Sequence, residues 1–464
     1  MKQTNFSPII YDFFSITISS FLIVNFTNNV KIFEIISINL LILIILTGSN
    51  FYKFSRKISL KKKIVTLIIV SSVTSFIKIL YFGYSLYINK FIYFDLNLLI
   101  LLLLPRFFLN INEFKINFVK NYSKTKKDIL VIGGLGYIGS HLVNRLLKDG
   151  KNVSVLDCCM YGKNTLKKFN NYQNFKFLEG YASDVVKLSK LMKDSSKVVH
   201  LAGLVGDPAC ALNEKDTKYF NIKTTNIIKN LCHDFEIEKF IFASSCSVYG
   251  NNRELCNEKT SPNPVSLYAA TKRDSELELL DTKTDTKILR FSTIFGPSER
   301  LRFDLVVNIF IAQAFFNKKI TVFGGDQSRP FLHVADAANS IYNFLNLNNR
   351  NSQEIYNIGF DELNFDIKDI AEIVKSRLNN GTLIDYSDDI PDKRNYRVSF
   401  LKYNNLFHNL KRYNINDGID QFLDLFKSKK IDYKDSIYSN MLTTKKFIEN
   451  QSNEIYSLNS FLND

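Results

Sequence analysis

The sequence ILVIGGLGYIGSHL at residues 129–142 most narrowly limits how this chain can fold. An apolar run precedes three glycines, Gly133, Gly136 and Gly139, and an amphipathic stretch follows them. Glycines at this spacing allow a tight turn and let backbone N–H groups approach a diphosphate at the start of a helix. We therefore predict a strand, a glycine-rich turn and a helix that together bind a dinucleotide.

The next apolar run, 152–157, ends in Asp157, which lies 18 residues after Gly139. A carboxylate at this position hydrogen-bonds ribose hydroxyls and repels a 2′-phosphate. Cys158 and Cys159 follow it where an arginine would accommodate that phosphate. The pattern therefore favours NAD over NADP. The six cysteines include no C-x2-C pair, so we predict neither a metal site nor a disulfide framework.

From Asp128 onward, short apolar runs alternate with amphipathic stretches. The pattern predicts strands at 128–133, 152–157, 175–180, 197–203, 239–245 and 287–292, and helices at 137–149, 215–234 and 265–282. Such alternation indicates an α/β fold whose parallel sheet is covered by helices and binds ligands at the carboxyl ends of its strands. We predict a Rossmann doubly wound parallel sheet with a smaller C-terminal substrate lobe.

Two further motifs carry side chains suited to proton transfer. SSCSVYG (244–250) follows a predicted strand, and YAATK (268–272) begins a predicted helix. Tyr268 and Lys272 are four residues apart and share one helical face. The ammonium group is expected to lower the pKa of the phenol toward the range of a general base, and Ser245 to hydrogen-bond the same substrate oxygen.

These motifs, with HLAG (200–203), Asn221, LRFSTIFGP (289–297) and RPFLHVAD (329–336), resemble the nucleotide-sugar epimerase/dehydratase branch of the extended short-chain dehydrogenase/reductase superfamily. The resemblance implies tightly held NAD, Tyr268 as the base, Lys272 as its partner and Ser245 on the reacting hydroxyl. The implied cofactor contacts are Gly133, Gly136, Tyr137, Ile138, Gly139, Asp157, Asp184, Leu201, Ala202, Gly203, Tyr268 and Lys272. The implied contacts to a nucleoside-diphosphate sugar are Ser245, Thr293, Arg302, Arg329 and Arg394.

The chain departs from that family at three places. Gly180-Tyr181 stands where the family commonly has Gly-Asp near the adenine, and Thr293 replaces a frequent substrate-binding Asn. Cys246 and Ser247 stand where the family's 4,6-dehydratases place the Asp-Glu pair that eliminates water. Without those carboxylates a dehydratase lacks its acid and base, so this departure favours epimerisation.

Residues 1–110 predict an all-α transmembrane region of about four helices. Two runs without formal charge, Phe13–Val30 and Ile35–Tyr52, are close to the ~20 residues that span a bilayer. Two further spans, 64–82 and 91–109, contain Lys78 and Asp95. Buried helices of a soluble protein are the alternative interpretation of all four.

Charge gives these spans an orientation. Residues 1–127 contain 16 Lys and Arg against 4 Asp and Glu, a net charge of +12 out of +15 for the chain. The basic residues cluster between the second and third spans and in the linker, 111–127, so the positive-inside rule predicts a cytoplasmic catalytic part. Nucleic-acid binding is disfavoured because the clusters adjoin apolar spans and lack interleaved aromatics. This region loosely resembles the membrane region of bacterial polysaccharide-biosynthesis epimerase/dehydratases.

The expected organisation has an NAD-binding domain at 128–428, with a lobe mainly from 297–330 and 380–428, and a polar tail of unknown role at 429–464. We expect a multi-pass protein of the bacterial inner membrane that epimerises a nucleoside-diphosphate sugar, at C4 through a 4-keto intermediate, for cell-surface polysaccharide synthesis. A homodimer is also expected. The alternatives are a dehydratase or 4-keto reductase and, from another class, a non-catalytic membrane scaffold that senses a dinucleotide.

Overall fold

The structure is a computed structural model that describes residues 127–347, 353–389, 392, 394–408, 410 and 412–449. All of these residues belong to one compact unit, Ser123–Asp464. Among them no helix is both long and apolar enough to cross a bilayer. The four predicted membrane spans lie outside the described residues.

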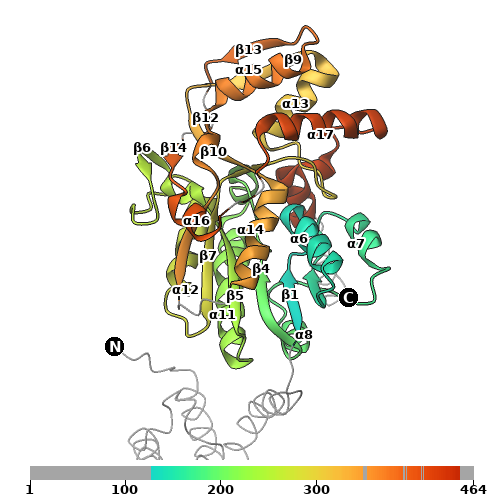
Figure 1. The fold of residues 1–464 in the computed structure, drawn as a ribbon, viewed down its shortest axis with the longest axis vertical. Helices are drawn as coiled ribbons and strands as arrows, with labels where there is room; N and C mark the ends of the chain where they lie inside the picture. The colour runs from blue at the N-terminus through green and yellow to red at the C-terminus, as the bar shows by residue number, and fades with distance from the viewer. Residues whose placement is uncertain are drawn as a thin grey trace, which may run out of the picture. The chain divides into compact units, whose positions relative to one another are not determined.

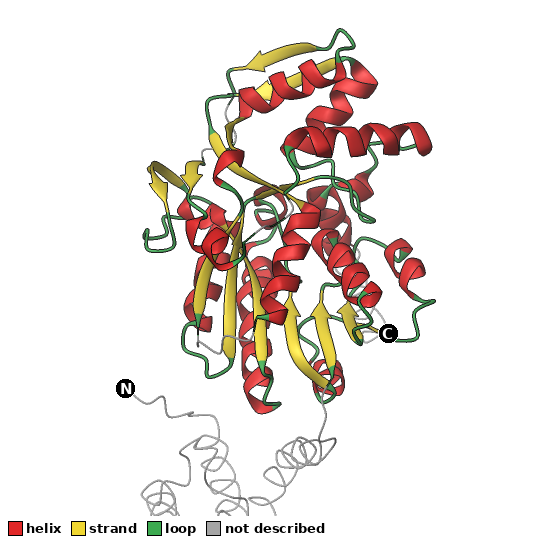
Figure 2. Cartoon of the chain, viewed as in Figure 1, coloured by secondary structure: helices red, strands yellow, loops and turns green. Residues whose placement is uncertain are grey.

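A seven-stranded parallel sheet forms the centre of this unit (Figures 1 and 2). Its strand order is β11-β7-β5-β4-β1-β2-β3. The strands are β1 (Asp128–Ile132), β2 (Val153–Asp157), β3 (Phe175–Glu179), β4 (Ser195–His200), β5 (Lys239–Ser245), β7 (Asp285–Phe291) and β11 (Glu354–Ile358). The order reverses between β1 and β4, which confirms the predicted doubly wound sheet and puts its ligand crevice at that point.

Helices cover both faces of the sheet (Figure 1). On one face, α6 (Tyr137–Lys148) packs along α14 (Val334–Asn346). On the other, α11 (Thr224–Asp234) lies between α8 (Val185–Met192) and α12 (Leu267–Leu279). The short helix α7 (Asn164–Phe169) follows β2. The apolar side chains of β1 and α6 are almost completely buried, so burial of this sheet supplies much of the stability of the fold.

A second group of elements forms the smaller lobe beyond the strand ends (Figure 1). Its helices are α13 (Val306–Asn317), α15 (Ile367–Leu378) and α17 (Ile415–Ser428). β9 (Lys319–Phe323) pairs with β13 (Leu383–Ser387), and β10 (Ser328–His333) lies between β8 (Thr293–Phe295) and β12 (Asn364–Asp366). A parallel pair, β6 (Asn251–Cys256) and β14 (Asn395–Val398), connects the lobe with the main sheet region, and α16 (Leu401–Leu406) follows it.

The helix predicted at 215–234 is interrupted. The chain forms α10 (Glu214–Lys218), a π-helical turn at Tyr219–Lys223, and then α11. Inside the turn, the buried Asn221 side chain accepts a hydrogen bond from the Leu204 backbone N–H (2.8 Å) and donates to the Leu204 carbonyl (3.0 Å). The wider turn therefore directs Asn221 to the loop after β4, in agreement with the tendency of π turns to occur at functional sites.

Candidate active site

One cavity of about 570 Å³ lies at the carboxyl ends of β1, β2, β4 and β5. Its lining includes 15 of the 17 residues that the sequence analysis selected for cofactor, substrate or catalysis. These are Gly133, Gly136, Tyr137, Ile138, Gly139, Asp157, Leu201, Ala202, Gly203, Ser245, Tyr268, Lys272, Thr293, Arg302 and Arg394. Asp184 and Arg329 are not among the lining residues. The fold thus brings most of the selected side chains to one place.

The glycine-rich turn between β1 and α6 has no room for side chains at its key positions. Gly133 has a φ of +85°, and a Cβ there would lie 2.7 Å from the Ala202 backbone nitrogen. A Cβ on Gly139 would lie 2.4 Å from the Gly133 carbonyl oxygen. The turn therefore presents bare backbone to the cavity at the start of α6, the geometry that a diphosphate requires.

Asp157 ends β2 and holds this turn in place. Its carboxylate accepts hydrogen bonds from the backbone N–H groups of Leu135 and Cys159, both at 2.9 Å. Burial raises the pKa of Asp157, although these two hydrogen bonds oppose the shift. The carboxylate lines the cavity beside the glycine turn, where it can also accept from ribose hydroxyls.

Asp184, which the resemblance implies as a cofactor contact, lies at the start of α8. It is the N-cap of α8, where its side chain accepts from the Lys187 backbone N–H at 3.0 Å and pairs with the Lys187 ammonium at 3.3 Å. These contacts lower the pKa of Asp184. A helix start after β3 uses the carboxylate as a cap. Tyr181 lines the cavity at this point instead.

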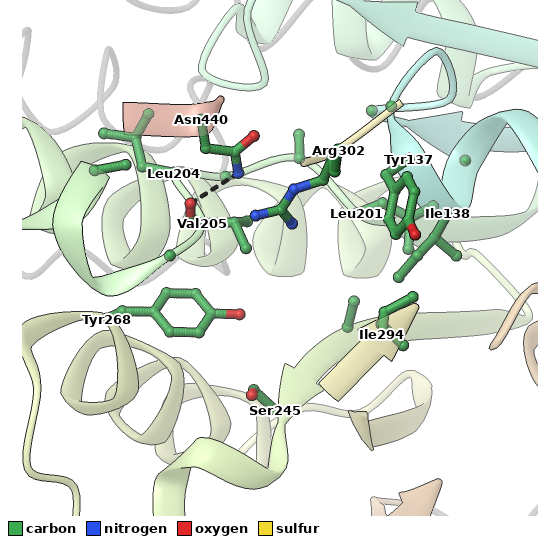
Figure 3. A pocket seen from close by; sticks show the side chains of 18 of the residues that line it. Tyr137, Ile138, Leu201, Leu204, Val205, Ser245, Tyr268, Ile294, Arg302 and Asn440 are labelled. Atoms are coloured by element: carbon green, nitrogen blue, oxygen red, sulfur yellow. Dashed lines mark hydrogen bonds between the residues drawn. The ribbon is translucent and has the colours of Figure 1, made fainter. Parts of the chain in front are cut away.

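Ser245 and Tyr268 face the same space from two elements (Figure 3). Ser245 is the last residue of β5, and Tyr268 lies in the first turn of α12, which Ser266 caps by accepting from the Ala269 N–H. Burial raises the pKa of Tyr268, while hydrogen bonding to Ser245 lowers it to a smaller extent. The expected net lowering by Lys272 is therefore not found, because desolvation of the phenol has the larger effect.

Lys272 lies one helical turn after Tyr268, with its ammonium 5.9 Å from the centre of the Tyr268 ring. The Nζ atom donates a hydrogen bond to the Ala243 carbonyl at 2.8 Å. Burial lowers the pKa of Lys272 to about 8. A lysine whose pKa is this close to neutrality can respond to charge changes on a neighbouring group during a reaction.

A buried ion pair fixes the face of α12 that carries these residues. Glu276, one turn after Lys272, receives bonds from Arg290 of β7 at 2.6, 2.9 and 3.2 Å, and each side chain is 3% exposed. Ser244 also donates to Glu276, and Arg290 donates to the Tyr249 hydroxyl at 2.9 Å. Because every partner is satisfied, the network holds the helix in a single orientation.

Arg394 reaches the cavity from the loop before β14. Its guanidinium pairs with Asp392 at 2.6 Å and with Asp207 of the short helix α9 (Asp207–Cys210) at 3.1 Å. Arg329 is buried on β10 and contacts the same Asp392 at 3.0 Å. Asp392 thus links the two arginines, of which Arg394 lines the cavity and Arg329 does not.

Arg302 enters from the loop after β8. It forms two hydrogen bonds with Asp304, both 2.9 Å, and lies 5.8 Å from the centre of the Tyr137 ring. Burial and the paired Asp304 act on its pKa in opposite directions, and the net pKa is raised. Figure 3 shows this guanidinium between Tyr137 and Asn440. Thr293 lines the cavity from β8.

The sequence analysis missed several lining residues. Arg300 and Tyr161 line the cavity from loops and Tyr396 lines it from β14; Ser439, Asn440 and Met441 line it from the segment predicted to be a polar tail of unknown role. Within that segment, residues 440–449 form a helix. The chain after 428 therefore contributes to the site, which local patterning of its polar residues did not indicate.

A profile described as the NAD dependent epimerase/dehydratase family matches residues 129–359. The dTDP-D-glucose 4,6-dehydratase of Mus musculus is 30% identical over 287 residues, which cover 57% of this chain and 79% of that protein. The chain belongs to the NAD dependent epimerase/dehydratase family. A second family relative, an uncharacterized UDP-glucose epimerase of Bacillus subtilis, is 33% identical over 226 residues, 46% of this chain and 71% of that protein.

Solved structures of the family show the same fold. A UDP-glucuronic acid 4-epimerase from Bacillus cereus, in complex with UDP-glucuronic acid and NAD, has a TM-score of 0.59 and 26% identity. A UDP-N-acetylglucosamine 4-epimerase from Methanobrevibacter ruminantium has a TM-score of 0.58 and 26% identity. Each comparison covers 65% of this chain and 99% of the other. Because the family is NAD dependent, the cofactor of this chain is NAD.

The residues of the cavity fit that cofactor. The bare backbone at Gly133 and Gly136 leaves space for a diphosphate, and Asp157 offers a carboxylate for a ribose. Lys272, Tyr268 and Ser245 lie at the far end of the same cavity. This arrangement holds a dinucleotide with its reactive end beside the proton-transfer groups.

Proposed function

We propose that this protein is an NAD-dependent epimerase that inverts C4 of a nucleoside-diphosphate hexose through a 4-keto intermediate. Two solved relatives at 26% identity are named as 4-epimerases of UDP sugars. A dehydratase is the competing function, because the mouse relative at 30% identity is named as a 4,6-dehydratase. The choice between them depends on the side chains that follow Ser245.

The environment of Cys246 and Ser247 carries the proposal. Both are buried in the 3-10 turn after β5, and neither lines the cavity. The Cys246 thiol donates to the Arg290 carbonyl, at 3.2 Å. Because neither side chain lines the cavity, neither can contact a sugar that is bound there, whereas Tyr268 can. The positions where the resemblance implies the acid and base of an elimination thus hold groups that cannot do that chemistry.

The carboxylates that do line the cavity are Asp157, Asp207 and Asp304. Asp157 accepts from two backbone N–H groups, and Asp304 is held by both nitrogens of Arg302. Asp207 pairs with Arg394 and accepts a hydrogen bond from Ser266 at 2.6 Å. Each carboxylate therefore has a binding or positioning partner, which leaves Tyr268 as the group suited to proton transfer.

In the proposed mechanism, Ser245 binds the C4 hydroxyl and Tyr268 takes its proton. The glycine turn and Asp157 would hold NAD, which would supply reversible hydride-acceptor chemistry at C4. Lys272 stabilises the phenolate form of Tyr268 by its positive charge. After the keto sugar turns in the cavity, Tyr268 returns the proton to the oxygen at C4. Atoms and electrons are conserved over the cycle, so no external reductant is consumed.

The substrate diphosphate is assigned to Arg302 and Arg394. Guanidinium groups bind phosphate oxygens in pairs, and both side chains line the cavity. Each is already paired with an aspartate, at 2.9 and 2.6 Å. These aspartates orient the guanidinium planes and keep the paired charges from repelling one another.

We also propose that residues 1–110 tether the enzyme to the bacterial inner membrane, with the catalytic part in the cytoplasm. The apolar spans and the basic loops between them support this location. A membrane tether is consistent with a role in cell-surface polysaccharide synthesis. Expression with a reporter fused after residue 127 tests it, and recovery of the reporter in the soluble fraction would contradict it.

Proton NMR of the purified chain with nucleoside-diphosphate sugars in heavy water tests the reaction. An epimerase inverts C4 and admits no deuterium to the carbon skeleton, since the same hydride returns. A dehydratase gives a 4-keto-6-deoxy product that contains deuterium. A reductase instead converts reduced cofactor in proportion to product. If every sugar is returned unchanged while NAD is bound, the non-catalytic scaffold becomes the better interpretation.

A further inference from the structure

We infer that residues 436–449 complete the NAD site, with Arg300 and Asn440 beside the diphosphate and Phe447 supporting Tyr181 beside the adenine. This inference rests on NAD as the cofactor and is independent of the proposed epimerisation. The segment follows the last helix of the smaller lobe, α17, and its residues 439–441 line the cavity. Three observations support the assignment.

The first observation is that Asn440 connects two loops at the cavity. Its side-chain amide donates to the Val205 carbonyl at 2.8 Å, a contact drawn in Figure 3. Its side-chain oxygen accepts from Arg300 at 2.6 Å, and its backbone N–H donates to Asp304 at 3.0 Å. Asn440 is 4% exposed, so these bonds are protected from water. One residue thus joins the loop after β4 to the loop after β8.

The second observation is a buried guanidinium group, that of Arg300, with one N–H donor left without a partner in the described structure. Arg300 is 6% exposed and lines the cavity, and within the described structure its Nε atom has no hydrogen-bond partner. Its guanidinium lies 3.9 Å from the centre of the Tyr161 ring. Burial and the nearby Arg302 lower the pKa of Arg300 to about 10. An anion would both use the free N–H and neutralise the charge, since Asp304 is already engaged by Arg302.

The helix 440–449 adds to this electrostatic preference. Its first turn lies at the cavity, and Ser439 caps it by accepting from the Leu442 N–H at 3.4 Å. The partial positive charge of a helix N-terminus favours a phosphate. The N-terminus of this helix and the unpartnered Nε atom of Arg300 would both attract the same anion. A dinucleotide diphosphate is the anion that the adjacent glycine turn is shaped to hold.

The third observation is an aromatic cluster farther along the same helix. Tyr181 lies 6.3 Å from Phe220 and 6.1 Å from Phe447, measured between ring centres. From Asn440 to Phe447 a helix rises about 10 Å, comparable with the length of an adenosine phosphate. Tyr181 is 39% exposed and lines the cavity, so its ring is available for stacking on a base. This offers a substitute for the family's aspartate at that position.

The segment is anchored independently of these contacts. The Phe303 backbone N–H donates to the Tyr438 carbonyl at 3.1 Å, and the Phe303 ring packs on Tyr438 at 5.5 Å and Tyr433 at 6.1 Å. Tyr433 also stacks on Phe316 of α13 at 5.5 Å. Substitutions at Asn440 and Phe447 therefore leave the anchor of the segment intact.

The test measures how fast bound NAD exchanges with isotope-labelled NAD in the full chain. Asn440→Ala is expected to raise the exchange rate about tenfold, and Phe447→Ala by a smaller factor. Lys445→Ala, an exposed position on the same helix, is the matched control and should leave the rate unchanged. Competition then localises the effect: affinity for ADP should fall with Asn440→Ala, whereas affinity for nicotinamide mononucleotide should not.

Two outcomes would overturn the inference. One is unchanged NAD exchange in variants of Asn440 and Phe447 that fold normally. The other is an equal loss of affinity for ADP and nicotinamide mononucleotide, together with a lower unfolding temperature, because a general loosening of the fold would then explain both. If Asn440→Ala does not fold, Phe447→Ala and Arg300→Lys decide the question. Turnover is not used as a readout, so a wrong reaction assignment cannot produce either result.

Discussion

The two walls of the cavity are built in different ways. One wall consists of the glycine turn after β1, Asp157 and Ser245 at the ends of β2 and β5, and Tyr268 and Lys272 of α12. The other consists of Arg300, Arg302, Arg394 and Asn440, which come from loops and from the segment after α17. We call them the motif wall and the assembled wall. The first is positioned by regular secondary structure. In the second, neighbouring aspartates orient Arg302 and Arg394, and contacts between segments distant in sequence hold Arg394 and Arg300.

The two walls therefore have different proposed roles: one carries out the reaction, and the other binds the phosphates of cofactor and substrate. In the proposed mechanism, a substitution on the motif wall removes a group that transfers a proton or orients the reacting atoms. A substitution on the assembled wall removes a charge or hydrogen bond proposed to hold phosphate. Changes in the first wall should therefore act on kcat, and changes in the second on KM or cofactor exchange.

Tyr268→Phe should have the largest effect. Removing the phenol oxygen deletes the proposed base, and general-base catalysis contributes ~10²–10⁴ to a rate. We expect kcat to fall by about 10³-fold, with little change in NAD exchange, as measured by steady-state kinetics and isotope exchange. Near-normal turnover would show that another group is the base and would end the assignment of chemistry to this wall.

Lys272 gives a test by pH. Burial lowers its pKa to about 8, whereas an unfolded lysine titrates near ~10.4. Between these values the unfolded state binds more protons, so the free energy of unfolding due to Lys272 rises with pH. Below pH ~8 both states are protonated, and the burial penalty is constant.

We expect the native chain to gain about 3 kcal/mol between pH ~8 and ~10.5 relative to Lys272→Met, because each pKa unit corresponds to ~1.4 kcal/mol. Chemical denaturation of both proteins across this range measures the difference. A difference that does not vary with pH would mean that water reaches Lys272 and that the motif wall is less dry than the structure indicates.

On the assembled wall, Arg394→Gln should raise the KM for the nucleoside-diphosphate sugar about 30-fold, because a charge-assisted hydrogen bond contributes ~1.5–3 kcal/mol. The kcat should change by less than about threefold. Arg394→Lys is the conservative control and should recover part of the affinity but not the paired geometry. A fall in kcat at constant KM would contradict this prediction, because Arg394 would then act on the reaction and not on substrate binding.

The smallest effect is expected at an ion pair outside both walls. Arg377 of α15 donates to Asp420 of α17 at 2.9 Å, and the two side chains are 48% and 45% exposed. Solvent weakens such a pair, so Arg377→Ala should cost less than ~0.5 kcal/mol in free energy of unfolding. Kinetic constants should equal those of the native chain, which makes this variant a baseline for the others.

The motif wall could be predicted because its signals are local. Gly133, Asp157 and Tyr268 each follow or open a regular element, and parallel strands bring their ends to one edge. The assembled wall could not, since no short-range pattern relates Asn440 to Val205 or Arg300. Arg329 shows the same limit: its pairing with Asp392 depends on the folded lobe, and the motif that contains Arg329 gives no sign of it.

The tertiary environment also determines the pKa shift of Tyr268 and the contacts of Asp184. The direction of the Tyr268 pKa shift depends on how completely the phenol is buried, which residue spacing does not reveal. Asp184 sits at a position where both a cofactor contact and a helix cap are chemically reasonable. The start of α8 determines that it caps the helix.

The π-helical turn at Tyr219–Lys223 has a consequence for sequence change in this region. A π turn is equivalent to one extra residue inserted into an α-helix. Because the wider turn takes up the extra residue, deleting one residue there would restore a regular helix and leave Ile228 and Cys232 of α11, both fully buried, on the face that packs on the core. The deletion would instead remove the wide turn that directs Asn221 to both backbone groups of Leu204. The extra residue therefore serves the loop after β4 and not the packing of α11.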